Sequence, residues 1–132
     1  MPIMPNGFSG LLFAAKYNLG SSDFWAVGDN LICPSLPKLK TSDLLDCVDL
    51  TSPIINAVQI HLDATVQARG YDNMLTCVCY LLSGSQAWLE EANAAAGWRD
   101  AVWEAVFAII NAGAPYPTPA EVVALLPPMV WP

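Results

Sequence analysis

The sequence predicts a mainly α fold, a small bundle of three to four helices with an extended or β-hairpin N-terminal arm. The longest segment of helical composition, 86–113, carries apolar residues in two stripes at spacings of three and four, which is typical of a helix with neighbours on both sides. Segments 53–69 and 73–83 also show helical periodicity, and their short connections favour antiparallel packing. We therefore expect an arm at 1–40 and a helical domain at 41–132.

The arm lacks a sustained helical period and is rich in Gly and Pro. Its short apolar runs, 11–15, 24–27 and 31–33, are separated by turn-forming sequences, which predicts a small hairpin or an extended arm that becomes ordered on a partner. An isolated hairpin is only marginally stable in water. The arm should therefore dock on its own helices or on another chain.

The helical domain begins with N-cap residues at 41–43, which predict a short helical turn. Ser52 as N-cap with Pro53 in the first turn is a clearer start, and Gly70 supplies a left-handed residue at the end of that helix. His61 and Asp63 lie off its apolar stripe and are expected on the solvated surface. Its buried face should consist of Ile54, Ile55, Val58, Leu62 and Val66.

Asp72 is the predicted N-cap of the next helix, which Gly84 ends, and Ser85 is the predicted cap of the long segment. The expected buried face of the shorter helix is Met74, Leu75, Val78, Leu81 and Leu82. Gly97 costs about 1 kcal/mol relative to alanine inside a helix, so it marks a hinge or a break in the long segment.

The last predicted helix starts at Thr118 and stops before Pro127. Thr118 as N-cap, Pro119 in the first turn and Glu121 at the third position form a capping box. The tail beyond it carries Trp131, which we expect to pack back on the bundle, with a contact to a partner as the alternative.

The composition favours an interaction protein. Hydrophobic residues make up 55% of the chain and charged residues 13%, against about 25% charged in ordinary soluble domains. Some apolar surface should therefore stay uncovered on the monomer, and exposed apolar patches tend to be interfaces. The alternative is a well-packed monomer with an Ala-rich helical core.

The net charge of -7, with five Lys and Arg residues, argues against a nucleic-acid or anionic-membrane partner, because both need a basic patch. No apolar run approaches the ~20 residues of a membrane span, and the N-terminus lacks the pattern of a secretory signal. The expected location is the cytoplasm.

The search for chemistry finds no catalytic residues, no cofactor and no small-molecule substrate. Cys77 and Cys79 are too close for a zinc knuckle, so we predict no metal and interpret the four cysteines as buried, reduced thiols. Asp100 and Glu104 lie one helical turn apart and leave a small hydrolase as a third alternative. A structural role is preferred, in which Arg99 and Asp100 bond to a neighbouring helix end or to the junction at 71–72.

The order of signals from residue 57 onward resembles the small helical domain of tail-fibre assembly, chaperone-like proteins of tailed bacteriophages and prophages. The resembling features are Asp63, Ala64 and Arg69 before the junction GYD at 70–72, the core WRDAVW at 98–103, and the cap PTP at 117–119 with LP at 126–127. They cover a little over half of the chain, and residues 1–40 do not share in the resemblance.

The resemblance implies a protein, not an enzyme, that binds a tail fibre, expected to be trimeric, and assists its folding in the host cytoplasm. The alternative is a permanent virion component of the tail or fibre tip. It brings no established binding residues. From the apolar and aromatic residues themselves we predict the following partner-binding set: Phe8, Leu12, Phe13, Phe24, Trp25 and Trp131.

Overall fold

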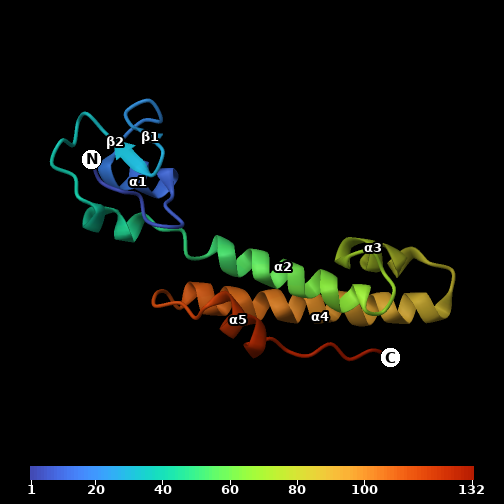
Figure 1. Cartoon of the computed structure of the whole chain (residues 1–132). Helices are drawn as coiled ribbons and strands as arrows, with labels where there is room; N and C mark the ends of the chain where they lie inside the picture. Colours follow the sequence, from blue (N-terminus) through green and yellow to red (C-terminus); the bar gives the residue numbers. More distant parts are fainter. The chain divides into compact units, whose positions relative to one another are not determined.

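The computed structural model describes residues 1–132, the side chain of Asp46 excepted. The chain is mainly helical, with a short antiparallel hairpin near its N-terminus, which confirms the predicted fold class (Figure 1). It divides into two compact units, Met1–Leu50 (unit 1) and Thr51–Pro132 (unit 2). The division follows residue 50 and not residue 40, because the 3-10 helix η1 (Thr41–Cys47) buries Leu44 and Cys47 in the core of unit 1.

Unit 1 contains helix α1 (Gly10–Tyr17), strands β1 (Trp25–Val27) and β2 (Asn30–Ile32), and η1. The predicted hairpin is present, but it belongs to a small folded unit and not to an extended arm. Its core consists of Phe13, Leu31, Cys33, Leu44 and Cys47. Helix α1 was not predicted, because eight residues are too few to show a sustained period.

The hairpin pairs Trp25 with Ile32, Ala26 with Leu31, and Val27 with Asn30. Gly28 adopts φ +58° in the two-residue turn, where a side chain would be strained. Residues 2–4 lie along the outer edge of β2. On that edge the N–H of Leu31 donates to the carbonyl of Pro2 at 3.0 Å, and the N–H of Met4 donates to the carbonyl of Asp29 at 2.7 Å.

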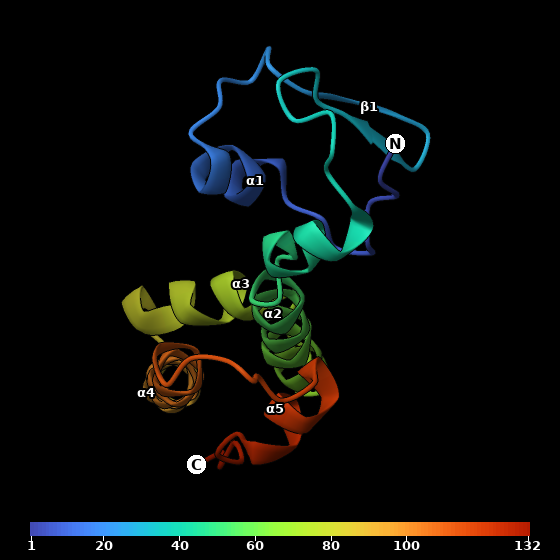
Figure 2. The same cartoon turned by 90° about the vertical axis from the view of Figure 1, so that its left-hand side faces the viewer.

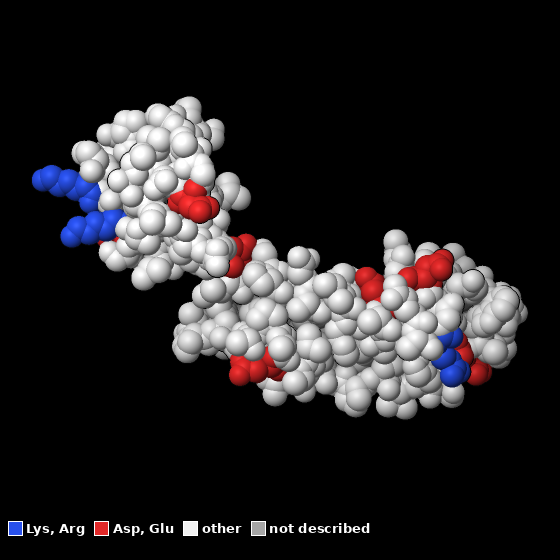
Figure 3. All heavy atoms as spheres, in the orientation of Figure 1, with Lys and Arg blue, Asp and Glu red and all other residues white. Residues whose placement is uncertain are grey.

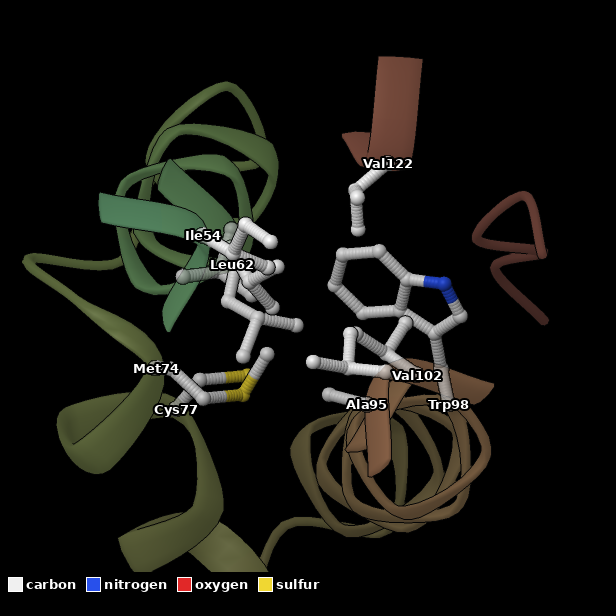
Figure 4. Packing of buried hydrophobic residues seen from close by; sticks show 11 residues of the cluster. Ile54, Leu62, Met74, Cys77, Ala95, Trp98, Val102 and Val122 are labelled. Carbon is white, nitrogen blue, oxygen red and sulfur yellow. The ribbon is translucent and has the colours of Figure 1, made fainter. Parts of the chain in front are cut away.

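Unit 2 is built on two long antiparallel helices, α2 (Ser52–Gln67) and α4 (Gln86–Asn111), which Figure 2 views nearly end-on. Helix α3 (Met74–Cys79) and the 3-10 helix η2 (Tyr80–Leu82) pack on α4, and α5 (Pro119–Leu125) packs on α2. The core fills the space between these helices (Figure 4). Its buried residues are Ile54, Val58, Leu62, Val66, Met74, Cys77, Ala95, Trp98, Val102, Val106 and Val122.

Two predicted caps shift by one residue. Thr51 and not Ser52 is the N-cap of α2, and Asn73 and not Asp72 is the N-cap of α3. The Asn73 carboxamide oxygen accepts from the N–H of Thr76 at 2.9 Å, so it satisfies a free donor of the first turn. The capping box of α5, from Thr118 to Glu121, is confirmed in both directions at 3.2 and 2.7 Å.

Helix α4 differs from the prediction in two ways. It runs without a break through Gly97, so the predicted hinge is wrong. Its second stripe is also covered only in part, because Trp103 and Ile110 pack against the core of unit 2 whereas Phe107 does not. Trp103 stacks on Phe107 at a centroid distance of 5.8 Å, and Phe107 stays 50% exposed.

Candidate functional site

A shallow apolar groove of about 520 Å³ lies on α3 and η2 of unit 2. It is lined by Leu75, Thr76, Cys79, Tyr80, Leu82 and Ser83. The groove arises because α3 ends at Cys79 and the chain continues as a 3-10 turn, which changes the direction of the following side chains. Leu75, Leu81 and Leu82, which the helical period predicts to be buried, are exposed, and Leu82 reaches 95%.

The groove borders a series of aromatic contacts. The ring of Tyr80 meets Trp88 and Tyr71 edge-on, both at a centroid distance of 5.4 Å. Tyr71 in turn stacks on Trp131 at 6.4 Å, and the guanidinium of Arg69 lies 5.4 Å from the Trp131 ring. These contacts hold η2 against α4 and hold the C-terminal segment against Tyr71. The groove therefore has a firmly packed base.

Glu91 joins α4 to the turn that follows α2. Its carboxylate accepts hydrogen bonds from Arg69 Nε at 2.9 Å and from the Tyr71 hydroxyl at 2.8 Å. The hydrogen bonds from Arg69 and Tyr71 lower the pKa of Glu91. Burial, followed by the hydrogen bond and the charge of Glu91, raises the pKa of Tyr71 to about 12. Sequence reasoning placed Arg99 and Asp100 at this junction, but those two residues pair with each other at 3.1 Å.

Two polar residues of α2 contact other elements of unit 2. Asp63 lies on α2, and its carboxylate accepts from the N–H of Met74 at 2.9 Å, which caps α3 from a neighbouring helix. His61 meets Trp98 edge-on at 5.8 Å and is half-buried. The prediction that His61 and Asp63 lie on solvated surface is therefore wrong for both residues.

The predicted partner-binding residues do not form one patch. Phe13 is fully buried in the core of unit 1, and Phe8 and Phe24 pack against that core, with Phe13 and Phe24 in edge contact at 5.0 Å. Trp131 packs on unit 2, as expected from its tail position. Leu12 and Trp25 remain exposed, and Val27 is exposed beside Trp25 on β1.

The hydrolase alternative loses its support. Asp100 is exposed and ion-paired with Arg99, and Glu104 is exposed as well, so the two carboxylates do not share a buried pocket. Cys79 is exposed, which contradicts the expectation that all four thiols are buried, whereas Cys33, Cys47 and Cys77 are buried. Among the described side chains, no group of three or more His, Cys, Asp and Glu residues could hold a metal ion.

Most of the surface in Figure 3 belongs to uncharged residues, with carboxylates scattered over both units. Unit 2 contains seven acidic residues and only two cationic ones, Arg69 and Arg99. Both arginines are paired with carboxylates of the same unit. The groove therefore belongs to an acidic unit. Within the part of the chain that the structure describes, no helix is long and apolar enough to cross a membrane.

Searches with protein-family models and searches of curated proteins and solved structures find no match to this chain.

Proposed function

We propose that this protein binds the tail fibre of a tailed bacteriophage and assists its folding or assembly. The observation that carries the proposal is the apolar groove on α3 and η2, where Leu75 and Leu82 are exposed above a packed aromatic base. A single exposed leucine is ordinary, but a groove lined by several apolar side chains is typical of an interaction surface. The family resemblance supplies the identity of the partner.

The surface suits the proposed task. A large fibre exposes apolar side chains and unpaired strand edges while it folds, and these promote aggregation. An apolar groove can cover such side chains until the fibre trimer buries them. The acidic character of unit 2 favours a fibre segment that carries Lys or Arg beside its apolar residues.

A permanent structural role at the tail or the fibre tip is the second candidate. It uses the same groove, but it predicts a fixed copy number in mature particles. An assembly factor that leaves acts in the host cytoplasm and is absent from particles.

The first experiment is co-expression with a candidate tail-fibre protein, followed by size-exclusion chromatography with light scattering and mass spectrometry of purified particles. Fibre solubility that depends on this chain, together with its absence from particles, supports an assembly factor. A stoichiometric complex retained in particles supports the structural role, and no complex at all refutes both.

A groove variant locates the contact. Leu82→Glu places a charge in the groove and should abolish the complex, whereas Leu125→Glu introduces the same charge at an exposed leucine of α5 outside the groove and should not. Binding also has a chemical readout, because Cys79 lines the groove and is exposed. A bound fibre should slow the alkylation of Cys79.

A further inference from the structure

We propose that the outer edge of β1 receives one extended strand of a partner polypeptide, apolar at its centre and flanked by Lys or Arg. The choice of the fibre as that polypeptide rests on the proposed function. The open edge itself rests on the hydrogen-bond pattern of the hairpin, and it lies in unit 1, whereas the groove lies in unit 2.

The hydrogen-bond pattern shows which groups are open. Residues opposite each other in an antiparallel pair alternate between exchanging hydrogen bonds and pointing them outward. The N–H of Leu31 points outward, because it donates to the carbonyl of Pro2 on the far side of β2. Its opposite residue, Ala26, must therefore direct its N–H and C=O to the outer edge of β1. Among the described residues neither backbone group of Ala26 has a hydrogen-bond partner.

The two edges of the hairpin are thus unequal. Residues 2–4 cover β2 with the two hydrogen bonds described above and the bridge between Ile3 and Asn30. No such segment lies along β1 in the described residues, and all three of its residues are exposed. Proteins protect open edges with Lys, Pro or a covering segment, and Trp25, Ala26 and Val27 supply none of these. An added strand is the usual occupant of such an edge.

Side chains extend the contact beyond one pair of backbone groups. Trp25 and Val27 alternate with Ala26 and therefore share one face of the hairpin, where they are 49% and 54% exposed. A partner strand with Val, Ile or Thr opposite them would bury part of both. The edge is short, so we expect weak binding by this contact alone.

The charges at its ends argue against a second copy of this chain. Asp23 and Asp29 flank β1, and the carboxylate of Asp23 is held near the start of the strand by the N–H of Gly20 at 2.6 Å. Antiparallel pairing of two β1 strands about Ala26 brings the Asp23 end of one strand beside the Asp29 end of the other, so carboxylates of both copies gather at each end of the pair. Like charges opposite each other destabilise a strand pair. A foreign strand with Lys or Arg at these positions gains at both ends instead.

The test uses the full chain and a synthetic peptide of alternating Val and Thr with Lys at each end. Amide resonances are followed by NMR during titration up to millimolar peptide. We expect the Ala26 amide to shift and to become protected from hydrogen exchange. A peptide with Glu at each end should bind about ten-fold more weakly, because two attractive pairs become repulsive. No change at Ala26 with the Lys peptide, or equal binding of both peptides, overturns the inference.

Matched variants distinguish loss of the contact at the β1 edge from loss of the fold of unit 1. Ala26→Pro removes the outward N–H without breaking a hairpin hydrogen bond and should abolish binding, whereas Ala26→Val keeps the N–H and should bind normally. Unreactive Cys33 and Cys47 thiols confirm that the Ala26→Pro variant keeps the core of unit 1. Binding by Ala26→Pro equal to that of the unmodified chain contradicts the inference.

Co-purification with the fibre distinguishes this inference from the proposed function. If the unmodified chain and Ala26→Pro co-purify equally with the fibre, the edge is not the contact, but the proposed function stands. If the Lys peptide binds the edge and no fibre complex forms, the proposed function fails and the open edge stands.

Discussion

The indole N–H of Trp98, in the middle of α4, donates a hydrogen bond of 2.7 Å to the backbone carbonyl of Pro127. Trp98 belongs to the core of unit 2, since only 7% of the residue is exposed. One side chain therefore joins the central helix to the segment that follows α5, twenty-nine residues later in the sequence. This contact makes the C-terminal segment part of the fold.

Removing this hydrogen bond should destabilise unit 2. Trp98→Phe keeps an aromatic ring but leaves the Pro127 carbonyl without its donor and a gap beside the core, so we expect a loss of about 1–3 kcal/mol in the free energy of unfolding. Urea unfolding followed by far-UV circular dichroism measures it. Trp88→Phe, at a half-exposed position of the same helix, should cost about 0.5 kcal/mol or less. Equal losses in both variants would contradict the assigned role of Trp98.

Glu91 should make stability depend on pH in the acid range. Its pKa is lower in the folded chain than in the unfolded chain, because the hydrogen bonds from Arg69 and Tyr71 favour the carboxylate. The contribution is complete above the unfolded pKa, with a reference value of 4.5, and is lost as the pH falls through the folded value. Unfolding experiments between pH 6 and pH 3 should therefore show a shallower decline for Glu91→Gln than for the unmodified chain. Parallel curves would refute this.

Tyr71 should titrate at an unusually high pH for a tyrosine. Burial and Glu91 raise its pKa to about 12, so the protonated hydroxyl stabilises the fold below the unfolded pKa of 10.0, and this contribution is lost as the pH rises toward 12. An absorbance titration at alkaline pH should show a tyrosine that ionises near pH 12. Glu91→Gln should lower that pKa without returning it to 10.0, because burial is the larger cause.

Two glycines should respond oppositely to alanine. Gly97 lies inside the continuous α4 helix, and an added Cβ would meet nothing within 4 Å, so Gly97→Ala should stabilise unit 2 by about 0.5–1 kcal/mol. Gly70 adopts φ +108°, where a side chain is strained, so Gly70→Ala should destabilise by about 1 kcal/mol or more despite the same open space. Thermal unfolding of both variants tests the pair. If Gly97→Ala destabilised the protein, that result would support the predicted hinge at Gly97.

The four thiols should differ in their rate of reaction with a thiol reagent, with one fast and three slow. Cys79 is exposed, whereas Cys33, Cys47 and Cys77 are buried, and burial also raises the pKa of the Cys77 thiol. A colorimetric thiol reagent should therefore titrate one equivalent rapidly in the native chain and four in denaturant. Cys79→Ser should remove the rapid phase, and a rapid phase that survives this substitution would contradict the described burial.

Unit 2 should fold without unit 1, because its core draws only on residues after 50. A fragment of residues 51–132 should keep its helical circular dichroism and unfold cooperatively. A fragment of residues 41–132, cut at the boundary that the sequence suggests, exposes Leu44 and Cys47, which unit 1 buries. It should aggregate more readily. Loss of structure in the shorter fragment would show that unit 2 depends on unit 1.

Local signals in the sequence determined the elements of this protein. The span of α4, the start of α2 near Pro53, the left-handed Gly70 and the capping box of α5 all depend on residues within one helical turn of each other, so they can be predicted without knowledge of the fold. The hairpin is predictable for the same reason, from two apolar runs on either side of a short turn. The apolar composition predicts uncovered apolar surface, but it could not show which apolar side chains stay exposed.

Only the tertiary structure decided which of these residues meet. Arg69 and not Arg99 pairs with Glu91, Asp63 caps a helix that is not its own, and Trp98 reaches Pro127. The groove likewise requires α3 to end at Cys79, which leaves Leu82 outside although its spacing suggests burial. Such contacts join residues far apart in the chain. Periodicity reports which side of a helix is apolar, but only packing decides which apolar side is covered.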